Sequence, residues 1–257
     1  MKKLLLILLC LPMIGFGQDV YIPDANFKVY LVGDTAINTN GDAEIQVTEA
    51  TVYSSYISCV ALNITDLTGI EAFTALTQLS CYTNQITSLD LSQNIALIDL
   101  QCQNNQLTAL DVSANTALTY LGCNGNQLTS LDLSDNTSLV YLSCGNSQLQ
   151  CLKIANGNNL NLDDCSIWNS PLLTCIEADD STYMNNNWQS HFGPINSQYY
   201  FSNHCNNDCS LTYIQEHTTN KELLKVTDLL GRETKQTNQP LFYIYDDGTV
   251  EKRIVIE

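Results

Sequence analysis

The chain has 257 residues and is strongly acidic, with 10 Lys and Arg against 27 Asp and Glu and a formal net charge of −17. Binding to a phosphate backbone needs a basic patch, so this balance excludes a nucleic-acid-binding protein. It fits a soluble extracellular surface and leaves a divalent cation open as a partner.

Residues 1–17 have the features of a secretory signal peptide. Lys2 and Lys3 precede an apolar run that is too short to span a bilayer, and a small-x-small cleavage site follows at Gly15–Gly17. Cys10 lacks the small preceding residue that a lipid anchor needs, so an anchor is the less favoured alternative. We expect export to the periplasm and, from there, a secreted or cell-surface product.

Residues 18–58 are expected to form a helix–loop–helix cap. Asp24 is a predicted N-cap for a helix that carries Phe27, Tyr30 and Leu31 on one side.

The loop of this cap carries oxygen-bearing side chains at calcium-ligand spacing. Asn38, Asn40, Asp42 and Glu49 fall on positions 1, 3, 5 and 12 of the pattern D-x-[DN]-x-[DN]-G-x5-E. The stretch resembles EF-hand and dockerin loops, which implies calcium bound by these four residues and by the carbonyl of Glu44. The alternative is a polar loop without metal, favoured by Asn at position 1 and by Ala in place of the turn Gly. No other cofactor is expected.

Residues 59–175 repeat with a fixed 21-residue period. The period is marked by five cysteines at a spacing of 21 residues: Cys81, Cys102, Cys123, Cys144 and Cys165. Cys59 precedes the first of them by one residue more than this spacing. A leucine lies five residues before each of these five: Leu76, Leu97, Leu118, Leu139 and Leu160. Polar and apolar residues alternate around each cysteine, which predicts a half-buried strand. Stacked units of this length bury one continuous core.

An asparagine follows each of the first three cysteines by three residues, at Asn84, Asn105 and Asn126, where its amide can satisfy backbone groups at a corner. The unit Leu-x-x-Leu-x-Cys-x-x-Asn-x-Leu/Ile resembles the leucine-rich repeat family. The resemblance implies an α/β-type fold: a short right-handed solenoid of 21-residue repeats with a parallel β-sheet. The small C-terminal β-sandwich that we expect after it is implied by a separate resemblance of residues 210–257, described below.

The cysteines of the ladder are expected to be buried free thiols. Side chains on neighbouring parallel rungs lie about 4.8 Å apart and do not approach as a disulfide requires. Cys151, Cys175, Cys205 and Cys209 lie off the ladder and are the disulfide candidates, with Cys175 and Cys205 flanking a C-terminal cap.

That cap, residues 176–209, is rich in aromatic residues that can cover the open end of the core. Cys165 is expected to keep the repeat register in the last full turn before it. A zinc site within the cap is the rival interpretation, but no CxxC spacing supports it. It would use His191, His204, Cys205 and Cys209.

Residues 210–257 are richer in Lys and Arg, and four strands are predicted in them: one around Leu211, Tyr213 and Ile214, and the others at 223–230, 241–245 and 249–256. Asp247-Gly248 is a hairpin turn signal between the last two. The segment resembles the type A sorting domain of the Bacteroidota type IX secretion system, which implies that it directs passage through the outer membrane. The residues that carry this resemblance are Gly231, Arg232, Asp247, Gly248, Lys252 and Arg253. A dimerising β module is the alternative.

No catalytic constellation emerges from the sequence, and we expect a non-enzymatic protein. The outward strand positions combine tyrosine with amides and hydroxyls, which suits adaptable recognition of a protein or glycan on a concave sheet. These positions are Gln78, Ser80, Tyr82, Asp99, Gln101, Gln103, Tyr120, Asn124, Tyr141 and Ser143. A surface-attached hydrolase and a structural spacer without a ligand are the alternatives.

Overall fold

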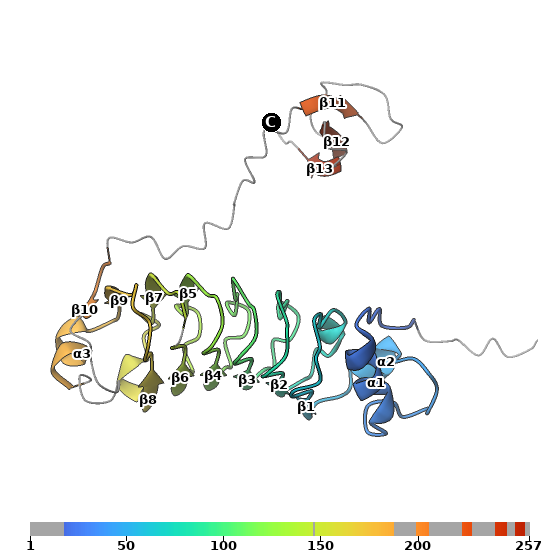
Figure 1. Ribbon diagram of the computed structural model, residues 1–257, viewed down its shortest axis with the longest axis horizontal. Coiled ribbons are helices and arrows are strands. Elements are labelled where there is room, and N and C mark those ends of the chain that lie inside the picture. The colour runs from blue at the N-terminus through green and yellow to red at the C-terminus, as the bar shows by residue number, and fades with distance from the viewer. Residues whose placement is uncertain are drawn as a thin grey trace, which may run out of the picture. The chain divides into compact units, whose positions relative to one another are not determined.

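The computed structural model describes residues 18–145, 147–187, 199–205, 223–227, 240–245 and 250–254. The chain divides into two compact units, Met1–Ser210 and Leu211–Glu257. The first unit holds a parallel-sheet solenoid with a helical cap at its N-terminal end (Figure 1). None of the helices in the described ranges has the length and apolar character of a membrane span.

The N-terminal cap contains α1 (Ala25–Gly33) and α2 (Val47–Ala50). As predicted, Asp24 is the N-cap of α1, and its Oδ1 accepts the backbone N–H groups of Asn26 and Phe27 at 2.9 and 3.0 Å. Phe27 and Leu31 are fully buried. The other carboxylate oxygen of Asp24 accepts the backbone N–H and the hydroxyl of Thr65, so one side chain joins the cap to the first turn.

Two parallel sheets form the sides of the solenoid (Figure 1). The six-stranded sheet contains β1 (Tyr56–Ser58), β2 (Gln78–Ser80), β3 (Asp99–Gln101), β4 (Tyr120–Gly122), β6 (Tyr141–Ser143) and β8 (Asp164–Ser166). The four-stranded sheet contains β5 (Ser130–Asp132), β7 (Cys151–Lys153), β9 (Cys175–Glu177) and β10 (Tyr200–Ser202). Short 3-10 helices lie in two corners, Ile70–Ala72 and Asn159–Asn161, and α3 (Ser181–Asn187) packs beside β10. The chain is thus a parallel-sheet β-solenoid of about six turns.

The core runs between the two sheets as columns of side chains. The central residue of each strand in the six-stranded sheet points inward and is buried: Ile57, Leu79, Leu100, Leu121, Leu142 and Cys165. Two residues further on, Cys59, Cys81, Cys102, Cys123 and Cys144 form the cysteine column. These five cysteines and Cys165 are all buried and free, as predicted. Each inward leucine contributes about 1.5–3 kcal/mol of apolar burial.

The expected register of the last turn is wrong. Leu142 pairs with Cys165, so Cys165 occupies the leucine column, and Ile167 takes the place of a cysteine beside Cys144. This turn is longer than the turns before it, because the corner around the second 3-10 helix contains two additional residues. The insertion also moves the expected inward Leu160 to the surface, where it is 71% exposed, and Leu162, 6% exposed, is buried instead.

The predicted asparagine ladder is present at the corner that follows the six-stranded sheet. Asn105 Nδ2 donates to the carbonyls of Cys81 and Cys102, both at 3.1 Å, while its Oδ1 accepts the N–H of Ile86 at 3.1 Å. Asn84 and Asn126 make equivalent contacts one turn before and after. Each amide therefore joins two turns and satisfies backbone groups that are out of reach of water.

A second ladder, which the sequence analysis did not single out, lies at the opposite corner. Asn94, Asn115 and Asn136 are fully buried. Asn115 Nδ2, for example, donates to the carbonyls of Leu91 at 3.1 Å and Asn94 at 2.9 Å. Their 21-residue spacing in the sequence is the signal that could have identified them.

The second unit contains a three-stranded antiparallel sheet of β11 (Leu223–Thr227), β12 (Pro240–Tyr245) and β13 (Val250–Ile254). β12 lies between the other two strands, and Tyr243 pairs with Val226 on one side and Glu251 on the other. The β-sandwich stays a prediction, because the described residues of this unit form one sheet.

Candidate functional site: the outer face of the six-stranded sheet

The outer face of the six-stranded sheet consists of the strand residues that point away from the core and of the outward residue that follows each strand. Its first row runs across adjacent strands as Tyr56, Gln78, Asp99, Tyr120, Tyr141 and Asp164. The second row is Ser58, Ser80, Gln101, Gly122, Ser143 and Ser166. The third row, which follows the strands, is Val60, Tyr82, Gln103, Asn124, Gly145 and Trp168. All ten residues predicted to face a ligand lie on this face.

Two tyrosines form the centre of the first row. The rings of Tyr120 and Tyr141, on neighbouring strands, have centroids 6.2 Å apart and an interplanar angle of 35°. Tyr141 is 44% exposed, and Tyr120 is half-buried. Partial burial raises the pKa of Tyr120, and the carboxylates of Asp99 and Asp164 raise it further. The Tyr120 ring therefore lies in a negative local field.

Hydrogen bonds hold several amides of this face in place. Gln101 Nε2 donates to both carboxylate oxygens of Asp99, at 3.1 and 3.2 Å. Ser143 donates its hydroxyl proton to Asn124 Oδ1 at 3.1 Å. The side chain of Gln103 lies over Gly122, where an added Cβ would come within 2.1 Å of Gln103 Nε2. Glycine at this position thus makes the room that the Gln103 side chain occupies.

One predicted contact residue is inaccessible, and two aromatic residues were missed. Ser80 is only 1% exposed, although it lies on the outward side of β2. Trp168 is 50% exposed and belongs to the row of Tyr82. A strict 21-residue register does not place Trp168 on the outer face, because only the two-residue insertion brings this residue into the third row. Tyr56 was missed because it precedes the first recognisable repeat.

The calcium-like loop is closed by its own hydrogen bonds. Glu49 Oε1 accepts the backbone N–H groups of Thr39 and Asn40 at 2.8 and 3.1 Å, and its Oε2 accepts the N–H of Gln46 at 3.0 Å. Burial raises the pKa of Glu49, but these hydrogen bonds outweigh it, and the net pKa lies below the ordinary value.

The other predicted ligands of this loop are engaged in the same way. Asn38 Oδ1 accepts the N–H of Gly41, and Asp42 accepts from the N–H of Glu44 and from two side-chain amides. The Glu44 side chain pairs with Lys28 at 2.6 Å. The side chains do not fit a calcium site in this arrangement, because a cation would have to displace these N–H donors. Calcium binding stays a prediction.

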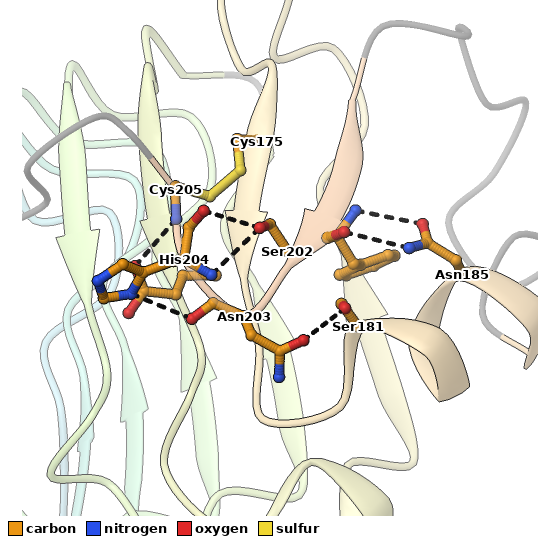
Figure 2. The surroundings of a disulfide bond; sticks show 9 residues. Cys175, Ser181, Asn185, Ser202, Asn203, His204 and Cys205 are labelled. Atoms are coloured by element: carbon orange, nitrogen blue, oxygen red, sulfur yellow. Dashed lines mark hydrogen bonds between the residues drawn. A yellow bond between two sulfur atoms is a disulfide. The ribbon is translucent and has the colours of Figure 1, made fainter.

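The C-terminal end of the solenoid is tied by a disulfide between Cys175 and Cys205, whose Cα atoms are 5.9 Å apart. Figure 2 shows the surrounding hydrogen bonds, in which Asn185 of α3 contacts the backbone of Phe201. Cys151 is disulfide-bonded as well. The alternative zinc site loses one of its four predicted ligands, because Cys205 is part of this disulfide. Two other predicted zinc ligands, His191 and Cys209, lie outside the described residues.

The predicted sorting residues are largely outside the described part of the chain. Four of them lie outside the described residues, as does the signal peptide: Gly231, Arg232, Asp247 and Gly248. Lys252 and Arg253 lie on β13, where the backbone alone is described.

Comparison with solved structures finds a similar protein with the same kind of cysteine column. The functional domain of InlJ from Listeria monocytogenes, which includes a cysteine ladder, is 36% identical, with a TM-score of 0.52. The match covers 63% of this chain and 38% of that chain. The fold is therefore that of a leucine-rich-repeat solenoid like those of internalins.

Two further internalins of Listeria monocytogenes are more distant. InlF is 18% identical with a TM-score of 0.42, and the match covers 64% of this chain and 66% of that one. Internalin C2 is also 18% identical, with a TM-score of 0.37 and coverage of 65% and 95%. No family model and no curated protein matches the chain.

Proposed function

We propose that the chain is a secreted or cell-surface, non-enzymatic binding protein whose ligand docks on the outer face of the six-stranded sheet. The observation that carries this proposal is the accessible pair Tyr120 and Tyr141, with hydrogen-bonded amides beside it. Tyrosine supplies contact area at low entropic cost, and pre-ordered amides supply adaptable polar contacts. A protein ligand is favoured over a glycan because a stack of rungs offers an extended surface.

The rigidity of this face supports a binding role over that of a spacer. Its residues stand on short strands whose inward neighbours are buried, so little side-chain and backbone freedom remains to be lost on binding. A spacer would not need exposed aromatic residues such as Tyr141 and Trp168 in two rows of the same sheet.

The experiment is a binding screen of the mature protein against protein and glycan arrays. The variant Tyr120→Ala/Tyr141→Ala removes the ring pair, and Tyr21→Ala removes an exposed tyrosine from the N-terminal cap as the matched control. We expect the double variant to lose binding and the control to keep it. Binding that survives in the double variant, or no binding by the wild type to any array, would contradict the proposal. Product release from an arrayed glycan or peptide would instead support a hydrolase.

Export is proposed to follow the two sequence signals, through the signal peptide to the periplasm and through residues 210–257 by the type IX system. The resemblance of the C-terminal segment supports this route. Truncation after Cys209, in a host with that system, should give a folded protein that stays in the periplasm. Surface display or secretion of the truncated protein at wild-type levels would contradict it.

A further inference from the structure

The first row of the outer face places carboxylates at both ends of an aromatic pair. Asp99, Tyr120, Tyr141 and Asp164 are successive register partners on four adjacent parallel strands. At about 4.8 Å per strand, the backbone positions of the two aspartates are roughly 14 Å apart. The order acid, ring, ring, acid is a linear array that an extended ligand can follow across the strands.

Neither carboxylate is neutralised by a basic side chain of the described solenoid. The three rows of the outer face contain these two aspartates and no lysine or arginine. Asp99 accepts from the neutral Gln101 amide, and Asp164 has no side-chain hydrogen bond or ion pair with another described residue. The two ion pairs of the described residues, Lys28–Glu44 and Lys153–Asp132, lie in the cap and on the other sheet.

The field of the two aspartates reaches the ring of Tyr120, which lies between them in the row. Both carboxylates add to the rise in the pKa of Tyr120 that burial begins. A ring face in a negative field attracts a cation more strongly than the ring quadrupole alone would. Sugar hydroxyls would gain less from this field, because they carry no charge. The charge pattern therefore favours a cationic ligand over a glycan.

We propose that this row binds a basic segment of a partner protein, with an arginine side chain stacked on the exposed ring of Tyr141 and further basic groups paired with Asp99 and Asp164. A guanidinium fits this array because it is planar, stacks on aromatic faces and donates in a fork to a carboxylate. The inference rests on the proposed role of the outer face in binding, and it specifies the chemistry of the partner.

The test uses calorimetric titration of the full mature chain with an acetylated tetra-arginine amide at low salt. Tetra-citrulline, which has nearly the same shape without the charge, is the matched probe. The variants are Asp99→Asn, Asp164→Asn and Tyr141→Leu. Asp135→Asn is the control, because Asp135 is exposed at a corner, lies off the outer face and changes the net charge equally.

We expect tetra-arginine to bind and tetra-citrulline not to bind. Each of the three variants should weaken binding by about two- to fivefold, the range for one exposed cation–π contact or ion pair. Asp135→Asn should leave the affinity within the error of the measurement. Thermal melting of each variant verifies that it is folded.

Four results would overturn the inference. Equal weakening by Asp135→Asn and Asp164→Asn would show that the overall charge of the chain attracts the probe. Equal binding of citrulline and arginine probes would show that charge plays no part. If tetra-arginine fails to bind while an arrayed ligand binds in a Tyr141-dependent way, the inference fails and the proposed function stands. If nothing binds through Tyr141, both fail.

Discussion

Replacement of Asn105 by alanine is expected to be one of the most destabilising single changes in the solenoid. The amide of Asn105 satisfies the carbonyls of Cys81 and Cys102 and the N–H of Ile86. Asn105→Ala leaves the N–H of Ile86 without a partner in a corner that water hardly reaches, while the carbonyls of Cys81 and Cys102 each keep one amide donor, from Asn84 and Asn126 respectively. At about 1–3 kcal/mol for the orphaned N–H and about 0.5–1.5 kcal/mol for each of the two lost amide–carbonyl hydrogen bonds, we expect a loss of roughly 2–6 kcal/mol. This is a large share of the stability of a typical domain.

The assay is urea unfolding followed by circular dichroism, with the slope of the transition compared between variants. Gln106→Ala is the matched control, since Gln106 is the next residue, is exposed and has no side-chain hydrogen bond to a described residue. It should change the free energy of unfolding by less than about 0.5 kcal/mol. A loss below about 1 kcal/mol for Asn105→Ala would refute the reasoning, because one unsatisfied buried N–H together with two lost hydrogen bonds costs more than that.

Four further predictions test other parts of the account. Leu160→Asp should change the free energy of unfolding by less than about 0.5 kcal/mol, whereas Leu162→Asp should lower it by several kcal/mol. If thermal melting shows the reverse order, Leu160 is the inward residue and the regular repeat register is correct. Glu49→Gln should lower the melting temperature at neutral pH. Because the folded-state pKa of Glu49 is depressed, the advantage of the wild type should be complete above about pH 4.3 and disappear as the pH falls through the folded value. A gap in melting temperature that does not narrow as the pH is lowered below about 4.3 would contradict this. Calorimetric titration of the wild type and Glu49→Gln with calcium tests whether the loop binds this ion. Equal heats of binding for the two proteins, or no heat with the wild type at millimolar calcium, would reject a calcium site at Glu49. Burial raises the pKa of Cys102 to about 12, so neutral iodoacetamide should leave it unmodified until the chain unfolds; rapid labelling of the native protein would contradict its burial.

The sequence predicts the solenoid well because its physical cause is periodic. A column of inward side chains needs the same residue type once per turn, so Leu79, Leu100 and Leu121 reveal the fold without any structure. The same reasoning predicts Asn105 and its neighbours in the ladder, since each turn has the same corner to satisfy. The pairing of Tyr120 with Tyr141 follows from the period as well.

The sequence misleads where the period changes without an obvious mark. Cys165 follows Cys144 at the spacing of the earlier cysteines, so it imitates the repeat although the turn that contains it is longer by two residues. The two extra residues lie in an Asn-rich corner, where insertion costs little because the chain is at the surface. The cap loop misleads for another reason. A spacing of oxygen-bearing side chains does not reveal whether Glu49 faces a cation or accepts backbone N–H groups.

The central claim is that the outer face of the six-stranded sheet is the binding surface. Its most direct test is to measure the dissociation constant of Tyr141→Ala for an arrayed ligand that the wild type binds. Tyr21→Ala, which removes an exposed tyrosine of the N-terminal cap, is measured as the control. The account predicts that Tyr141→Ala raises the dissociation constant at least about fivefold, the effect of losing roughly 1 kcal/mol of contact, while Tyr21→Ala leaves it unchanged. Equal dissociation constants for the two variants would contradict the claim.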